Sequence, residues 1–318
     1  RQVYEVYAAE DIYTADFQKD DTGKRILKYA KGEKVAELTT DESGKAELDN
    51  LPLGEYKVVE KTAPEGFVLN EEEQKISFVY ADQNTPVISQ SAEFINDRQK
   101  VEVSVVKKDA ENEKGLSGAE FGLYAKEDIK AGDKVLVKAD ELLTKAVTGE
   151  DGKTVFEQDL PFGTYYIKEL AAPDGFVLNE EAQTVTFSYK DQDTAVIEQT
   201  AAFDNDRQKV EVSVVKKDAE TDAVVAGAEF GLYAKEDILA HENVLVKADT
   251  LLGKAVTNED GKAVFDLDLP FGKYYIRELA APAGYVSSDE TLDVTAAYQG
   301  QDVNCLLYTS DAADDLIG

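Results

Sequence analysis

The sequence predicts an all-β protein built from tandem β-sandwich domains. Two observations support this prediction: one long stretch recurs three times, and the apolar residues inside each copy alternate as they do in strands. At 318 residues the chain is too long for one ordinary hydrophobic core. Short strands at regular spacing, with turn residues between them, are typical of a β-sandwich.

The repeat is clearest between residues 101–189 and 210–298, which align without a gap. Three glutamates, Glu60, Glu169 and Glu278, recur at a spacing of 109 residues. A unit of this length is a whole domain. We therefore expect separate domains along the chain rather than a solenoid of small repeats.

Within the second copy, alternating runs rich in Val, Thr, Phe and Tyr predict strands at residues 101–105, 153–156, 165–169 and 184–189. Residues 149–152 (Gly-Glu-Asp-Gly) and their counterparts in the other copies predict turns. A short helix or turn is expected near residues 139–145.

The two outer copies are expected to be incomplete. We predict a first domain at residues 1–99 without its first strand, because nothing precedes it that corresponds to residues 101–109. Residues 1–12 align with 118–129 at an offset of 117 rather than 109, which places an eight-residue insertion near Asp16–Lys34. The complete second domain is expected at residues 100–208.

The third domain is expected at residues 209–304 without its last strand, because the third copy departs from the second after Asn304. The following segment, residues 305–318, resembles the conceptual translation of a sequencing-library adapter, so we expect it to be an artefact outside the fold. A genuine disordered tail is the alternative.

Composition and charge exclude several classes of function. A net charge of −31 argues against nucleic acid or an anionic membrane as partner, since both require basic patches. The single histidine, His241, cannot supply a repeated catalytic or metal site, and no EF-hand spacing is present. We therefore expect no metal and no cofactor. No apolar run is long enough to span a membrane in this stretch of chain.

One glutamate in each copy interrupts an apolar strand face. Glu169 shares its face with Tyr165 and Ile167, because side chains two residues apart point to the same side of a strand. Glu60 and Glu278 stand at the same position of the other copies. Burying an unpaired charge is costly, so such a group is expected to have a partner or a proton.

Two further polar residues are expected on inward faces. Lys107 shares a face with Val105, and Asn205 shares one with Phe203. The counterpart of Lys107 in the third copy is Lys216, and the counterpart of Asn205 in the first copy is Asn96. The neighbouring Lys108 and Lys217 are rivals for this role, but alternation places both on the outward face.

A buried lysine, asparagine and glutamate can react with one another. Burial favours the neutral amine of Lys107, which is a nucleophile, and a protonated Glu169. We expect this carboxyl to donate a hydrogen bond to the amide carbonyl of Asn205 and to relay protons. The products would be ammonia and an amide between Lys107 and Asn205. A buried Lys–Glu ion pair that does not react is the alternative.

The motifs of the repeat resemble those of the SpaA-like and Cna B-type repeat domains of Gram-positive surface adhesins and pilins. The matching motifs are Val-Val-Lys-Lys-Asp at 105–109, Gly-Ala-Glu-Phe at 118–121, Leu-Pro-Phe-Gly-Thr-Tyr-Tyr-Ile-Lys-Glu at 160–169, Ala-Pro-Asp-Gly-Phe at 172–176 and Phe-Asp-Asn at 203–205. The resemblance covers nearly all of residues 1–304 and implies Ig-like, prealbumin-like β-sandwiches.

The same resemblance implies an intramolecular isopeptide bond between lysine and asparagine, assisted by glutamate. It assigns the complete set to Lys107, Glu169 and Asn205. The first copy has Glu60 and Asn96 without a lysine, and the third has Lys216 and Glu278 without an asparagine. Only the second domain is therefore expected to form the bond.

The resemblance further implies a non-enzymatic stalk of a cell-wall-anchored extracellular protein, with neighbouring repeats of the parent protein as partners. The alternative is an adhesive module that binds a host extracellular protein or glycan. The insertion in the first copy is the best candidate binding loop, whereas near-identical repeats favour a spacer. An enzyme acting on an external substrate would need an open cleft, and the three polar groups are expected on interior faces.

Overall fold

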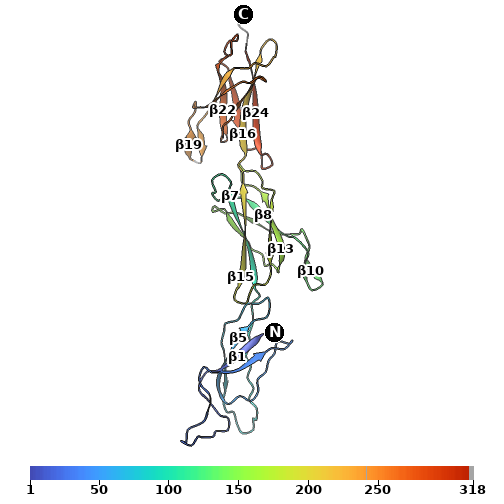
Figure 1. Ribbon diagram of the computed structural model, residues 1–318, viewed down its shortest axis with the longest axis vertical. Coiled ribbons are helices and arrows are strands. Elements are labelled where there is room, and N and C mark those ends of the chain that lie inside the picture. Colours follow the sequence, from blue (N-terminus) through green and yellow to red (C-terminus); the bar gives the residue numbers. More distant parts are fainter. Residues whose placement is uncertain (241, 315–318) are drawn as a thin grey trace.

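The computed structural model describes residues 1–240 and 242–314, and in these residues every regular element is a β-strand. Three bodies are stacked along one long axis, with the N-terminus on the lowest body in Figure 1 and the C-terminus at the far end. The predicted all-β fold of tandem Ig-like sandwiches is confirmed. His241 lies outside the described residues.

The second repeat contains the complete sandwich. Its larger sheet has the antiparallel order β11-β8-β13-β14, and its smaller sheet has the order β12-β7-β15. In the smaller sheet β15 runs parallel to β7. A separate hairpin pairs β9 with β10. The strands are β7 (Lys100–Asp109), β8 (Glu120–Ala125), β9 (Ile129–Ala131), β10 (Lys134–Val137), β11 (Leu142–Val147), β12 (Lys153–Phe156), β13 (Gly163–Ala171), β14 (Ala182–Phe187) and β15 (Val196–Asn205).

The core of this repeat lies between the two sheets, because alternate residues of each strand point inward. Three residues of different strands illustrate it: Val103, Phe121 and Ile167 are all fully buried. The hydroxyl of Tyr165, also buried, donates a hydrogen bond of 2.5 Å to Pro161 O. That bond satisfies the one polar atom that a tyrosine brings into an apolar core.

The third repeat has the same two sheets, with orders β20-β17-β22-β23 and β21-β16-β24 and a hairpin of β18 and β19. Its strands are β16 (Lys209–Asp218), β17 (Glu229–Ala234), β18 (Ile238–Ala240), β19 (Asn243–Val246), β20 (Leu251–Val256), β21 (Lys262–Phe265), β22 (Gly272–Ala280), β23 (Thr291–Ala296) and β24 (Cys305–Asp314).

The structure corrects the expectation that the third repeat lacks its last strand. Residues 305–314 form β24, which pairs in parallel with β16 in the register that β15 has with β7. Backbone hydrogen bonds form this ladder, and they need little from the side chains beyond alternation. Leu306 satisfies the alternation and is buried. The adapter origin of this segment stays a prediction about its sequence.

The first repeat has only the larger sheet in the described residues, with the order β4-β1-β5-β6, and a long hairpin of β2 and β3. Its strands are β1 (Val3–Ala8), β2 (Ile12–Tyr13), β3 (Leu27–Tyr29), β4 (Lys34–Thr39), β5 (Gly54–Thr62) and β6 (Gln74–Phe78). The extra residues predicted near Asp16–Lys34 lie in this hairpin.

The missing second sheet of the first repeat has a simple cause. In the second repeat β7 is the central strand and pairs with β12 on one side and β15 on the other. The first repeat has no counterpart of β7, so the segments that correspond to β12 and β15 have no ladder partner and form no strand. Val87 and Ile95 in the second of these segments are 73% and 77% exposed.

Of the short helix or turn expected near residues 139–145, the structure has the turn, at residues 139–140, and no helix. Asp140 has a positive φ of 61° and ends a turn, and β11 begins two residues later. Pairing of β11 with β8 supplies the backbone partners that a helix would have supplied internally.

We expect amide hydrogens of residues 79–96 to exchange with solvent much faster than those of residues 188–205. The former have no sheet partner, whereas most of the latter belong to β15 and its ladder with β7. Hydrogen–deuterium exchange of the whole chain measures both segments in one sample. Equal protection would contradict the absence of the second sheet from the first repeat.

Candidate functional site

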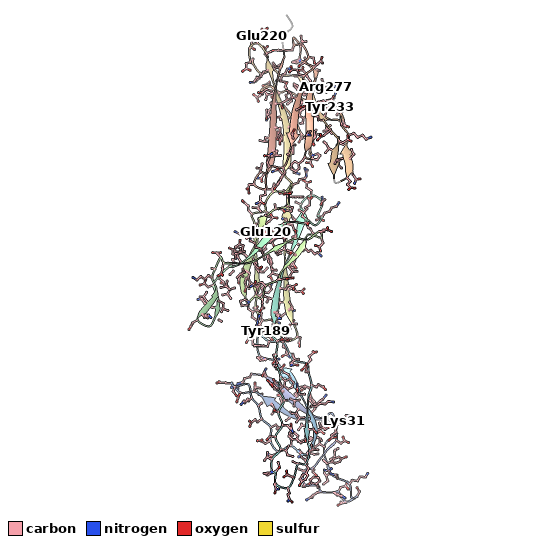
Figure 2. The ribbon with its side chains drawn as sticks, turned by 180° about the vertical axis from the view of Figure 1, so that it is seen from behind. Lys31, Glu120, Tyr189, Glu220, Tyr233 and Arg277 are labelled. Atoms are coloured by element: carbon pink, nitrogen blue, oxygen red, sulfur yellow. The ribbon has the colours of Figure 1, made fainter. Side chains whose placement is uncertain are left out.

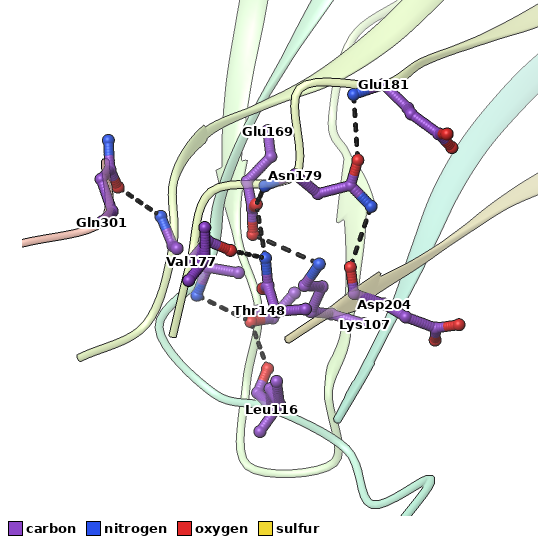
Figure 3. Close-up of polar contacts among 12 residues, drawn as sticks. Lys107, Leu116, Thr148, Glu169, Val177, Asn179, Glu181, Asp204 and Gln301 are labelled. Carbon is purple, nitrogen blue, oxygen red and sulfur yellow. Dashed lines mark hydrogen bonds and ion pairs between the residues drawn. The ribbon is translucent and has the colours of Figure 1, made fainter. Parts of the chain in front are cut away.

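Three strands of the second repeat bring the predicted polar residues together. Lys107 lies near the end of β7, Asn205 is the last residue of the adjacent β15, and Glu169 faces them from β13 in the opposite sheet. All three are buried, with exposed fractions of 0%, 1% and 4% respectively. Figure 3 shows the amine of Lys107 directed toward the carboxylate of Glu169. Alternation thus places the three groups as the sequence predicts, and Lys108 is exposed.

The backbone of Lys107 is held on both sides. Its N–H donates to Gly152 O at 2.7 Å, and its carbonyl accepts from Leu116 N at 3.0 Å. Gly152 has φ of +75°, and a Cβ atom there would lie 2.3 Å from Lys107 O. Only glycine permits this close approach, so the turn predicted at 149–152 positions the lysine.

The Lys107 amine lies in a mainly apolar environment. Its Nζ is 5.9 Å from the ring centre of Phe121 and 6.0 Å from that of Phe203. The only acid within ion-pair range among the described residues is Glu169, whose Oε1 is 3.4 Å away. Burial lowers the pKa of Lys107 below its ordinary value, and the charge of Glu169 opposes this shift only in part.

Glu169 lies between the lysine and the asparagine. Its Oε1 faces Lys107, while its Oε2 accepts hydrogen bonds from Asn205 Nδ2 at 2.8 Å and from the Asn179 backbone N–H at 2.7 Å. One carboxyl group therefore contacts both the nucleophile and the nitrogen of the amide. This arrangement allows a proton to pass from one side of the carboxyl group to the other.

The carboxamide of Asn205 has a defined orientation. Its Nδ2 also donates to Val177 O at 2.7 Å, and a carbonyl oxygen can only accept, so the nitrogen must point that way. No hydrogen bond reaches Asn205 Oδ1 or Lys107 Nζ from the described residues. Buried polar atoms without hydrogen bonds are rare and concentrate at functional sites.

This geometry corrects one expectation about the chemistry. The sequence-based mechanism has Glu169 donating to the carbonyl oxygen of Asn205. In the structure, Glu169 instead accepts from Nδ2, the nitrogen that would depart as ammonia. The carboxyl group therefore contacts the amide nitrogen of Asn205 rather than its carbonyl oxygen.

Two residues of this site are not among those predicted from the sequence. Val177 contributes its carbonyl, and Asn179 contributes its N–H, while the Asn179 side chain bonds to Asp204 O at 2.9 Å. A sequence signal for Asn179 existed, because Asn70 stands at the same position of the first repeat and donates its N–H to Glu60 Oε2 at 2.7 Å. The carbonyl of Val177 has no such signal, since every residue has one.

The first repeat contains two of the three groups. Asn96 Nδ2 donates to Glu60 Oε2 at 2.6 Å and to Val68 O at 2.9 Å, as its counterpart does in the second repeat. No lysine is present, and Gln2 Nε2 donates to Asn96 Oδ1 at 2.7 Å. The carbonyl that stays without a hydrogen bond in the second repeat is thus satisfied here.

The third repeat brings Lys216 and Glu278 together, with Nζ and Oε1 3.3 Å apart. The Ser288 N–H donates to Glu278 Oε2 at 2.8 Å. In the backbone register, Asp314 occupies the position of Asn205. Ala312 occupies the position of Phe203 and lines a cavity of about 20 Å³ beside Lys216. The segment 305–314 therefore completes the sheet but fills the core incompletely.

Other kinds of site find no support in the described residues. No group of three or more His, Cys, Asp or Glu side chains lies close enough to hold a metal ion within residues 1–240 and 242–314. No helix that could cross a membrane is found in the same part of the chain.

Comparison with known proteins identifies one family. The model of the SpaA prealbumin-like fold domain matches residues 9–92, 101–201 and 210–306, one stretch in each repeat. No match was found among curated protein sequences. Among solved structures, the Bacillus anthracis TIE protein is 26% identical with a TM-score of 0.59. That match covers 99% of this chain and 48% of that protein, so the chain spans about half of its length.

Two pilin structures match with lower similarity. The Streptococcal ancillary pilin is 18% identical with a TM-score of 0.30, covering 99% of this chain and 92% of that one. The shaft pilin SpaA from Lactobacillus rhamnosus GG is 19% identical with a TM-score of 0.27, covering 69% and 98%.

The lowered pKa of Lys107 predicts that the stability of an Asn205→Ala variant, which keeps the free amine, depends on pH. Between the folded pKa and the unfolded value of about 10.4, the unfolded chain binds more protons than the folded chain. The free energy of unfolding should therefore increase as pH rises through this interval. Urea unfolding at a series of pH values measures it.

The matched control is the double variant Lys107→Met/Asn205→Ala, which lacks the titrating amine but fills a similar volume. We expect the free energy of unfolding of this double variant to change less with pH in the alkaline range. Equal gradients in the two variants would contradict a lowered pKa for Lys107.

Proposed function

We propose that the tandem sandwiches of this chain, which belongs to the SpaA family of prealbumin-like fold domains, form a structural stalk. We further propose that the second repeat closes an isopeptide bond between Lys107 and Asn205 with the help of Glu169. The observation that supports this proposal is the buried contact of the three groups, in which the amine and the amide carbonyl have no hydrogen bond from the described residues.

The reaction balances without any cofactor. The neutral Lys107 Nζ attacks Cγ of Asn205 and forms a C–N bond, and the bond from Cγ to Nδ2 breaks. Nδ2 leaves as ammonia and takes with it one proton from the amine. The products are one amide and one ammonia, so the step needs no oxidant and no activated group.

Glu169 has the role of proton carrier in this proposal. Its Oε1 is 3.4 Å from Lys107 Nζ and its Oε2 is 2.8 Å from Asn205 Nδ2. It can take a proton from the attacking amine and give one to the departing nitrogen. The folded sandwich holds the reacting groups in place, which supplies the proximity that a reaction in solution would lack.

The bond would shorten the path of mechanical tension through the repeat. The chain enters at Lys100 along β7 and leaves at Asn205 at the end of the parallel β15. With Lys107 bonded to Asn205, tension would cross directly between these residues and bypass residues 108–204. By the loop-entropy model for disulfides, closing a loop of this length adds roughly 4–5 kcal/mol of stability.

This role implies a location and a set of partners. A stalk of this family would stand outside a Gram-positive cell, anchored to the cell wall, with neighbouring repeats of the parent protein as partners. The domain bounds 1–99, 100–208 and 209–304 remain part of the proposal, and residues 305–314 add the strand that completes the smaller sheet of the third repeat. The first and third repeats, with Glu60 and Asn96 or Lys216 and Glu278, would not complete this lysine–asparagine reaction.

The intact mass of the whole chain tests the bond. We expect the wild type to lack the mass of one ammonia and to yield a branched peptide joining Lys107 to Asn205 after proteolysis. Lys107→Ala, Glu169→Gln and Asn205→Ala should each restore the full mass. In each of them one of the three reacting groups is removed or can no longer carry a proton.

Lys108→Ala is the matched control, since Lys108 is the adjacent exposed lysine. It should keep the ammonia deficit. A wild type with full mass after prolonged incubation of the folded protein would refute the crosslink while leaving the fold unaffected.

A further inference from the structure

The two junctions between repeats are built from the same contacts. At the first junction the side-chain oxygen of Gln192 accepts a hydrogen bond from Ala63 N–H at 2.9 Å. The backbone carbonyl of Gln192 accepts another from Leu69 N–H at 2.8 Å. At the second, Gln301 accepts from Ala172 N–H at 2.8 Å and from Leu178 N–H at 2.9 Å. Both glutamines lie in the loop before the last strand of their repeat.

The receiving surface is one loop, which we call the socket loop. It begins with Ala-Pro-x-Gly and covers residues 63–69 in the first repeat, 172–178 in the second and 281–287 in the third. At each filled socket, one glutamine accepts hydrogen bonds from two backbone N–H groups of the loop. Because hydrogen bonds are directional, two of them to one glutamine fix both the position and the orientation of that residue in the socket.

The linker between repeats is tied down as well. At the first junction Val68 N–H donates to Asp97 O at 2.8 Å, and Gln99 N–H donates to Gly66 O at 2.9 Å. Nη2 of Arg98 donates to both carboxylate oxygens of Asp159 in the second repeat, at 2.5 and 2.6 Å. Arg207 pairs with Asp268 at the second junction. Such a linker is an ordered segment rather than a flexible tether.

A buried glutamine in each linker positions the loop that carries the docking glutamine. Gln99 is fully buried, and its side chain donates to Asp191 O and Thr194 O at 2.8 and 2.7 Å. Gln208 does the same at the second junction, with Gly300 O and Val303 O at 2.9 and 2.6 Å. Linker, socket and glutamine loop therefore form one connected network at each junction. Figure 2 shows Tyr189, next to the first of these loops, between the two lower bodies.

We propose that the socket loop of each repeat is a docking surface for the glutamine of the following repeat, and that this interface holds neighbouring repeats in one fixed orientation. This deepens the stalk role, because docked repeats form a stiff rod and freely hinged repeats do not. It does not depend on the isopeptide bond.

The third repeat supplies an internal reference, because its socket loop has no following repeat in this chain. No hydrogen bond to the N–H of Ala281 or Ser287, the counterparts of Ala172 and Leu178, is found in the described residues. Val286 of this loop is 53% exposed, whereas its counterpart Val177 is only partly exposed. The empty and filled sockets can thus be compared within one molecule.

The test measures the distance between spin labels on the whole chain. Labels go on Glu150→Cys and Glu259→Cys, two exposed turn residues on either side of the second junction, in a Cys305→Ser background. We expect one narrow distance distribution, which Gln301→Ala broadens. The matched control is Gln299→Ala, which should leave the distribution narrow, because within the described residues its side chain bonds only to Ala297 O of its own loop.

Hydrogen exchange on the same protein provides the second measurement. The N–H groups of Ala172 and Leu178 should exchange about fivefold more slowly than those of Ala281 and Ser287, since the loss of one hydrogen bond corresponds to about this factor. Gln301→Ala should reduce that difference for Ala172. Equal rates in the wild type, or a narrow distance distribution that survives Gln301→Ala, would overturn the proposal. Intact mass, measured in parallel, reports the isopeptide bond separately.

Discussion

The smaller sheet of each repeat depends on the pairing of one central strand. In the second repeat β7 holds β12 on one side and β15 on the other, and together they form one wall of the core. In the first repeat, where no such strand exists in the described residues, the segments that would flank it form no sheet, although their sequences resemble those of the second repeat. A strand at the edge of a sheet needs a partner for its backbone groups, so loss of the centre removes both neighbours.

The same strand carries the lysine of the candidate site. Lys107 reaches an apolar space closed by two aromatic rings, and the opposite sheet supplies Glu169 as its single ionic partner among the described residues. A buried ion pair is a weak source of stability, because desolvation offsets most of the attraction. A bond formed at this place would remove the charge and keep the connection between β7 and β15.

The proposed reaction and the proposed junction share one segment. In the loop after β13, the N–H groups of Ala172 and Leu178 donate to Gln301 of the next repeat. The same loop supplies Val177 O, which bonds to Asn205, and the Asn179 N–H, which bonds to Glu169. Figure 3 shows Gln301 of the third repeat beside this loop. The residues that orient Asn205 therefore lie against the neighbouring repeat.

The sequence by itself determined the class of fold, the inward position of Lys107, Glu169 and Asn205, and the outward position of Lys108. Two-residue alternation is a local property, so it can be predicted from one strand at a time. Only the tertiary structure decided that Glu169 contacts the amide nitrogen rather than the carbonyl, and that residues 305–314 complete a sheet. The first result depends on the carbonyl of Val177, and the second on the backbone groups of β16. Backbone groups are the same in every residue type, so the sequence does not reveal them, and they meet their partners only after the chain has folded.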